Sequence, residues 1–174
     1  MHPVAEEIIA EIDPSIHESV ARSVIGNSSA CLVDEPRWSE INAAHADLRT
    51  LAILRVKGTA SIGGQHMPWS SVQKIVDTTV DGGLADAGGW IHPAREEAVY
   101  ERELFKDDGL RFRPADCYRI TESTPGIKIF WLEDLTQADR APFSIEQLHQ
   151  IARDLGEFNG YHAGGEMESP LETA

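Results

Sequence analysis

The stretch PWSSVQKIVD, residues 68–77, carries a lysine among β-branched apolar residues. This composition is typical of a β-strand. Because side chains alternate between the two faces of a strand, Lys74 shares one face with Val72 and Val76, while Gln73 points to the other. A lysine among valines needs an anionic partner or a path for its ammonium to water. Lys74 is therefore the first candidate for a functional residue.

Further elements are predicted on both sides of this strand. Hydrophobic alternation and bounding turn residues indicate strands, and i, i+3, i+4 spacing indicates helices. Asp13-Pro14 separates two N-terminal helices, Gly26 fits a helix C-cap, and Ser144 with Gln147 forms a capping box. The expected strands span 30–41, 51–61, 69–77, 116–122 and 126–135, and the expected helices span 3–12, 15–25, 94–105 and 145–158.

This order of elements predicts an α+β fold. We expect a five-stranded, mostly antiparallel sheet, because the first three strands follow one another closely in the chain. One helix packs on the sheet, N-terminal helices precede it, and one C-terminal helix follows it.

Composition and charge narrow the function classes. The chain has 174 residues, of which 41% are hydrophobic and 25% charged, as in an ordinary folded protein. Its formal net charge of −14 argues against a broad surface for nucleic acid or an anionic membrane. It leaves room for one locally basic anion site, and it would attract a cationic substrate. With no signal peptide and no apolar run that spans a bilayer, the expected location is cytoplasmic.

No metal site is predicted. Cys31 and Cys117 match no metal or redox spacing, and the seven histidines form no zinc-binding motif. The expected helix at 94–105, in contrast, is rich in glutamate. Glu96, Glu97 or Glu103 can pair with Lys74, whereas the remaining carboxylates suit a solvated face near a helix N-terminus.

Several segments then stand in a recognisable order. They are RVKGTAS (55–61) with PWSSVQKIV (68–76), REEAVY (95–100), RPADCYRIT (113–121), IFWLEDL (129–135) and IARDLGEFNGYHAG (151–164). Together they cover roughly residues 30–163. The series resembles the small lobe of the aminoglycoside phosphotransferase and choline-kinase-like superfamily, relatives of the protein kinases, followed by the first helix of their large lobe.

The resemblance implies a nucleotide site. By position, Lys74 would contact the α- and β-phosphates of ATP, and Glu96 would orient Lys74. Backbone groups of Glu133 and Leu135 would face adenine, and Trp131 or Leu132 would line the pocket. The implied domains are N-terminal helices (1–26), a kinase-like small lobe (27–135), a hinge with the first large-lobe helix (136–163) and a disordered tail (164–174).

Two family features are missing from the sequence. The turn NAAHADLRT (42–50) has no glycine to bring backbone N–H groups to phosphates. The catalytic His-Gly-Asp motif and the later metal-binding aspartate do not occur, so no catalytic residue is predicted and Mg²⁺ ligands would lie in a missing lobe. The expected function is thus the nucleotide-binding lobe of a phosphotransferase acting on a small hydroxyl-bearing substrate.

Two other functions fit the same residues. One is a non-catalytic scaffold that forms a homodimer, or binds a partner or the missing lobe, through the apolar Ile145–Phe158 face. The other is an unrelated α+β domain for a small ligand, in which Lys74 would play no part in binding.

Overall fold

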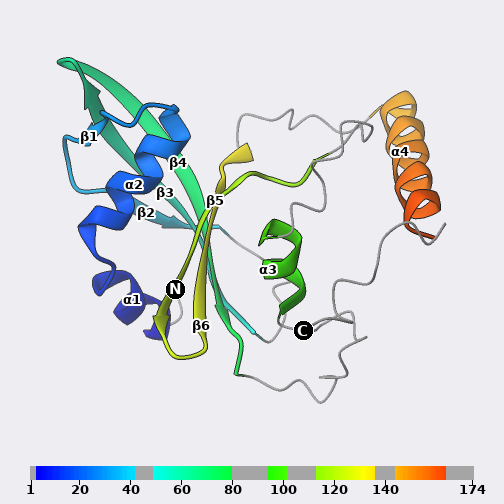
Figure 1. The fold of residues 1–174 in the computed structure, drawn as a ribbon, viewed down its shortest axis with the longest axis horizontal. Coiled ribbons are helices and arrows are strands. Elements are labelled where there is room, and N and C mark those ends of the chain that lie inside the picture. The colour runs from blue at the N-terminus through cyan, green and yellow to red at the C-terminus, as the bar shows by residue number, and fades with distance from the viewer. Residues whose placement is uncertain (1–2, 42–48, 80–93, 102–112, 136–143, 164–174) are drawn as a thin grey trace. The chain divides into compact units, whose positions relative to one another are not determined.

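The computed structural model describes residues 3–41, 49–79, 94–101, 113–135 and 144–163 (Figure 1). The chain divides into two compact units, one of residues 1–82 with 115–135 and one of residues 83–114 with 136–174. Several expectations lie outside the described residues. They concern the turn at 42–48, Glu103, the hinge at 136–143 and the tail at 164–174.

The first unit is built on one antiparallel sheet, which confirms the α+β class. Its strands run in the order β1-β3-β4-β6-β5, and β2 also pairs with β3. The strands are β1 (Cys31–Leu32), β2 (Arg37–Glu40), β3 (Thr50–Ile62), β4 (Gln65–Asp77), β5 (Cys117–Thr124) and β6 (Ile127–Glu133).

The sheet has six strands instead of five because the expected strand at 30–41 is interrupted between Leu32 and Arg37. Pro36 has no N–H to donate to the ladder. The Thr59 N–H of β3 is accepted by the side chain of Asp34, whose Oδ1 lies 2.9 Å away, and not by a backbone carbonyl of a paired strand. The chain therefore leaves β3 after β1 and returns to it as β2.

The long β3–β4 hairpin sets the frame of the sheet. Its turn is Gly63-Gly64, with φ of 56° and 84°, the left-handed values that a two-residue hairpin loop favours. The register then pairs Leu54 with Gln73 and Ile53 with Lys74. This pairing decides which side chains point to each face of the sheet.

Two helices cover one face of the sheet, α1 (Pro3–Ala10) and α2 (Pro14–Ile25) (Figure 1). Asp13 caps α2 by accepting the Ser15 N–H at 2.8 Å. Gly26 ends α2 in the left-handed conformation, with φ of 70°, as the sequence predicts. We call this side the helix-covered face.

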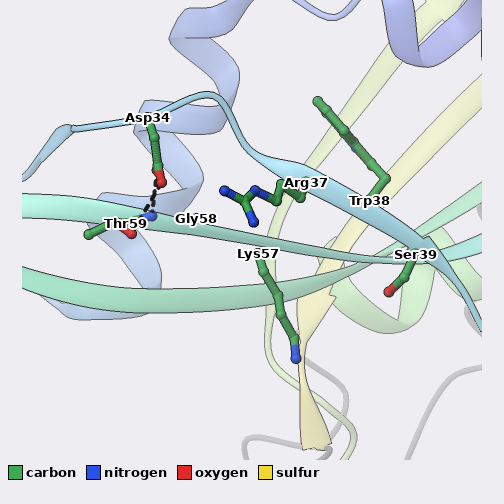
Figure 2. Close-up of a pocket in the computed structure, with 7 residues that line it drawn as sticks. All are labelled: Asp34, Arg37, Trp38, Ser39, Lys57, Gly58 and Thr59. Carbon is green, nitrogen blue, oxygen red and sulfur yellow. Dashed lines mark hydrogen bonds between the residues drawn. The ribbon is translucent and has the colours of Figure 1, made fainter.

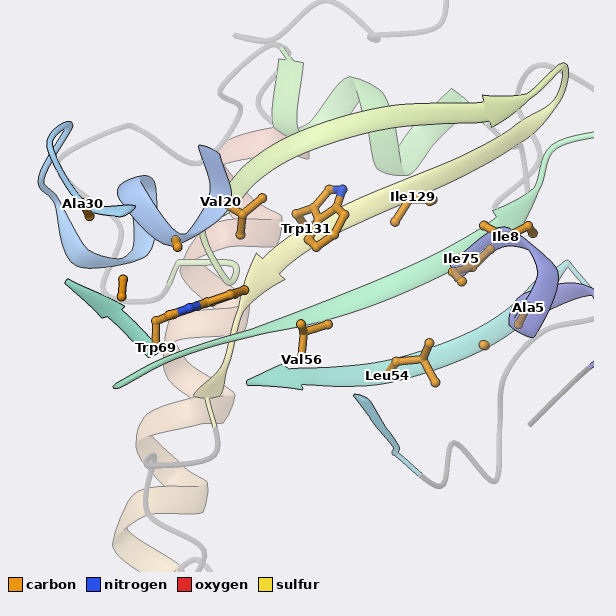
Figure 3. Close-up of a cluster of buried hydrophobic side chains, with 13 residues drawn as sticks. Ala5, Ile8, Val20, Ala30, Leu54, Val56, Trp69, Ile75, Ile129 and Trp131 are labelled. Carbon is orange, nitrogen blue, oxygen red and sulfur yellow. The ribbon is translucent and has the colours of Figure 1, made fainter. Parts of the chain in front are cut away.

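The hydrophobic core fills the space between these helices and the sheet (Figure 3). Val20 of α2 and Ile8 of α1 join Leu54, Ile75 and Trp131 of the sheet, and all are almost fully buried. Burying a side chain of this size contributes roughly 1.5–3 kcal/mol, so this layer fixes α1 and α2 on the sheet.

The second unit contributes α3 (Ala94–Glu101) and α4 (Ile145–Ala163). The predicted capping box of α4 is present. The Ser144 N–H donates to Gln147 Oε1 at 2.8 Å, and the Gln147 N–H donates to Ser144 Oγ at 3.2 Å. None of the described helices has the length and apolar content needed to cross a bilayer.

We expect Gly58→Ala to lower the free energy of unfolding by about 1–3 kcal/mol. A Cβ at this position would lie 2.8 Å from Nε1 of Trp69, and Trp69 is buried and cannot move aside freely. Urea denaturation measures the change, with Ser61→Ala on the same strand as control, expected within about 0.5 kcal/mol of the parent. Equal stability of the two variants would show that the Trp69 side chain yields.

Candidate functional site

Lys74 points away from the helices, as its strand pattern predicts. Its neighbour Gln73 is fully buried on the helix-covered face, so Lys74 extends from the opposite face. There it stands in register between Ile53 of β3 and Phe130 of β6. Lys74 thus lies in a strand and points to the face opposite Gln73, as the sequence predicts.

The structure separates Trp131 from Lys74. Trp131 pairs with Gln73 and lies fully buried on the helix-covered face, where its Nε1 donates to Thr121 Oγ1 at 3.2 Å. Leu132 pairs with Val72 and so shares the face of Lys74. Of these two candidates for a pocket wall, only Leu132 stands on the same face as the lysine.

The predicted adenine contacts lie at the end of β6. The Glu133 N–H donates to the Asp116 carbonyl oxygen at 2.8 Å, and Glu133 Oε2 accepts the Asp116 N–H at 3.2 Å. The backbone donor of Glu133 is therefore engaged in pairing with the chain ahead of β5. Leu135, two residues further, has a 51% exposed side chain.

Glu96 and Glu97 belong to α3 of the second unit, and Lys74 belongs to the first unit. The pairing of Lys74 with Glu96, and the choice among Glu96, Glu97 and Glu103, stay predictions. The apolar face of α4 is exposed at four positions, with side chains 38–69% accessible. These are Ile145, Leu148, Ile151 and Leu155. A partner on this helix also stays a prediction.

The sheet face opposite α1 and α2 gathers basic side chains. The register pairs Arg37 with Lys57 and Ser39 with Arg55, and it places Lys128 beside Val76, two residues from Lys74. Five of the chain's 15 basic residues thus share one face. We call this surface the basic face, defined as Arg37, Arg55, Lys57, Lys74 and Lys128.

Carboxylates accompany two of these five. Arg55 Nε lies 3.0 Å from Oδ2 of Asp134, whose side chain is 4% exposed. Lys128 stands opposite Glu122 of β5 in the register. The basic face thus gathers five cations in a chain whose net charge is −14, and two of the five, Arg37 and Lys57, form no ion pair with any described residue.

A cavity of about 400 Å³ lies at the Arg37–Lys57 end of this face (Figure 2). Arg37 and Lys57 extend from neighbouring strands, and their tips point in different directions (Figure 2). Ser39 and Thr59 add hydroxyl groups to the lining. Asp34 also lines the cavity, but its carboxylate already accepts the Thr59 N–H and, at 3.4 Å, the Thr59 hydroxyl.

Within the part of the chain that the structure describes, the side chains of Arg37 and Lys57 make no hydrogen bond and no ion pair. Like charges placed directly opposite each other on neighbouring strands destabilise the pairing. An anion bound beside both would remove this cost and gain charge-assisted hydrogen bonds. The pair is therefore the most distinctive chemical feature of the basic face.

A second cavity, of about 530 Å³, opens between α1, α2 and the segment that joins β1 to β2. His17 of α2 lines it and is 5% exposed. The His17 ring stands edge-on to Trp38 and Trp131, with ring centroids 5.4 Å apart in each case. Burial lowers the pKa of His17 below its usual 6.5, and the nearby Glu35 carboxylate opposes this shift.

Sequence reasoning missed both features. Arg37 and Lys57 are 20 positions apart, and only the register of β2 on β3 shows that they are neighbours. His17 entered the sequence argument only as a possible metal ligand. Its place on the apolar stripe of the second helix was the available signal. Among the described residues, no group of three or more His, Cys, Asp or Glu could hold a metal ion.

Comparison with known proteins gave no relative. No family model, no curated protein and no solved structure matches the chain. The likeness to phosphotransferases therefore rests on the sequence segments alone, and the function has to be argued from the two cavities.

We expect stability to fall below pH 6.5 because of His17. The folded-state pKa of His17 is lowered, so below 6.5 the unfolded chain binds a proton that the folded chain does not. The free energy of unfolding therefore keeps its full value above pH 6.5. Below it, the free energy of unfolding falls by up to about 1.4 kcal/mol for each pH unit. Urea unfolding at pH 7, 6 and 5 should show a shallower slope for His17→Phe than for the parent.

The control for this measurement is His66→Gln, which changes an exposed histidine of β4. That variant should keep the slope of the parent protein, because it replaces an exposed side chain and leaves the buried His17 in place. A slope unchanged in His17→Phe would show that His17 takes up its proton in the folded state as readily as in the unfolded chain.

Proposed function

We propose that this chain is a binding domain for a small phosphate-bearing molecule, held at the Arg37–Lys57 end of the basic face. One observation carries the proposal. Two cations stand directly opposite each other beside a cavity and form no ion pair with any described residue, although the Asp34 carboxylate lines the same cavity, in a chain that is otherwise strongly acidic. A doubly charged anion satisfies this arrangement better than a single carboxylate, because it offers one charge to each cation.

The chemistry of the lining favours phosphate. An arginine guanidinium can donate two parallel hydrogen bonds to phosphate oxygens, and a lysine ammonium serves as a mobile point charge. The hydroxyls of Ser39 and Thr59 supply further donors. At physiological ionic strength charges beyond about 8 Å are largely screened, so these local groups outweigh the acidic remainder of the chain.

A nucleotide is the specific form that the sequence resemblance suggests. Lys74 lies on the same face, and its β3 partner Ile53 is four residues from Lys57, about 13 Å along the strand. In this second candidate function Lys74 holds the phosphates of Mg-ATP, as in the nucleotide-binding lobe of a phosphotransferase for a small hydroxyl-bearing substrate. The chain would bind ATP without transferring its phosphate, because it lacks the catalytic aspartate and the Mg²⁺ ligands.

Isothermal titration with pyrophosphate tests the anion site. Arg37→Ala and Lys57→Ala should each weaken binding about tenfold, since each removes a charge-assisted contact worth roughly 1.5–3 kcal/mol. Lys128→Ala is the matched control, because it removes the same charge from the same face but lies outside the cavity. Equal losses in all three variants would mean that pyrophosphate senses only the general charge, and no saturable binding would end the proposal.

Lys74→Ala separates the two candidate functions. If the site takes a nucleotide through Lys74, this variant should lose Mg-ATP affinity about tenfold, and pyrophosphate affinity should change little. The same titrations on Arg37→Ala provide the comparison. Unchanged Mg-ATP affinity in Lys74→Ala would reject the phosphotransferase-lobe form and would leave the Arg37–Lys57 site to be judged by pyrophosphate.

A further inference from the structure

The second cavity lies against the helix-covered face and has a different character from the first. Apolar residues from two parts of the chain line it, namely Ile9 and Ile12 from the first helix and its end, and Leu32, Pro36 and Trp38 from β1, β2 and the segment between them. Its volume of about 530 Å³ falls within the usual range of small-molecule sites, roughly 300–1,000 Å³. The walls therefore suit the apolar body of a small ligand.

Carboxylates from two separate segments join this apolar lining. Glu6 comes from α1 and Glu35 from the segment between β1 and β2, and both residues are exposed. Neither carboxylate makes an ion pair or a hydrogen bond with any described residue. Asp34 lines the cavity as well, but its two oxygens are engaged by Thr59. Two carboxylates without a counter-charge thus stand beside an apolar space.

Buried polar atoms provide an independent observation. His17 lines the cavity and is only 5% exposed. Its Nε2 atom has no hydrogen-bond partner in the described part of the chain. Nε1 of Trp38, whose ring lies edge-on to that of His17, is likewise buried without a partner in the described part of the chain. Leaving such groups unpaired costs free energy, so a ligand or water that reaches them is favoured.

We infer that this cavity binds a small organic amine. Its ammonium pairs with the carboxylates of Glu35 and Glu6, and its apolar body lies between Ile12 and the Trp38 wall. An aromatic wall suits such a ligand, because the face of an indole ring attracts a nearby cation. The two cavities share Asp34 and Trp38 in their linings, but the carboxylates assigned to the amine and the cations assigned to the anion are different residues.

The protonation state of His17 is compatible with a cationic ligand. A buried imidazole with a lowered pKa is neutral near pH 7, so it does not repel an ammonium. A neutral imidazole also keeps one nitrogen as a hydrogen-bond acceptor.

Two-dimensional NMR titration of the full chain with phenethylamine tests this inference. A ligand of this size should give saturable shifts with a Kd on the order of 1 mM. The shifts should fall on amides of α1, α2 and residues 32–38. Its neutral counterpart 2-phenylethanol should bind at least about fivefold more weakly, because it cannot pair with the carboxylates. Equal affinities would overturn the amine assignment.

Matched variants locate the charge contact. Glu35→Gln and Glu6→Gln should each weaken phenethylamine binding about threefold, as loss of a partly exposed ion pair implies. Glu7→Gln is the control, because Glu7 is the exposed neighbour of Glu6 on α1 and does not line the cavity. Equal effects of Glu7→Gln and Glu6→Gln, or no saturable shifts in the parent, would refute the site. Pyrophosphate affinity should stay unchanged in all three variants.

Discussion

The pairing of β3 with β4 is the constraint on which the rest of the structure depends. The two strands, each of 13 residues, meet through a two-glycine turn and keep their register from Ile62–Gln65 to Ala52–Ile75. A shift of one residue would send every side chain to the opposite face. Leu54, Val56 and Ile75 would then leave the core, and the lysines of β3 and β4 would enter it. The core, the basic face and both cavities therefore all depend on the register between β3 and β4.

Local features were the part of the fold that the sequence could predict. The Gly26 cap and the Ser144 capping box depend on a few adjacent residues, and each forms as expected. The face of Lys74 also followed from simple alternation. The interruption at Pro36 did not, because residues 30–41 have enough β-branched and aromatic content to be predicted as one strand. What breaks them is a contact from Asp34 to Thr59, 25 positions away.

The candidate site was predicted less well for a related reason. Sequence motifs pointed to Lys74 and to the end of β6, but they could not show that Trp131 faces the core or that Glu133 bonds to Asp116. Charge pairs between strands depend on register, and register depends on packing over the whole face. Periodicity alone therefore could not show that Arg37 and Lys57 stand opposite each other, although both residues lie in strands that the sequence predicted.

The interruption between β1 and β2 has a consequence for self-association. An edge strand with a long free row of N–H and C=O groups invites another chain to add a strand, which leads to aggregates. Here one border of the sheet is made of two short pieces, of two and four residues, separated by a proline and flanked by charged side chains. Short, charged, proline-broken edges are a known protection against such growth. The same break that opens space for the cavities thus also shields this border from strand addition.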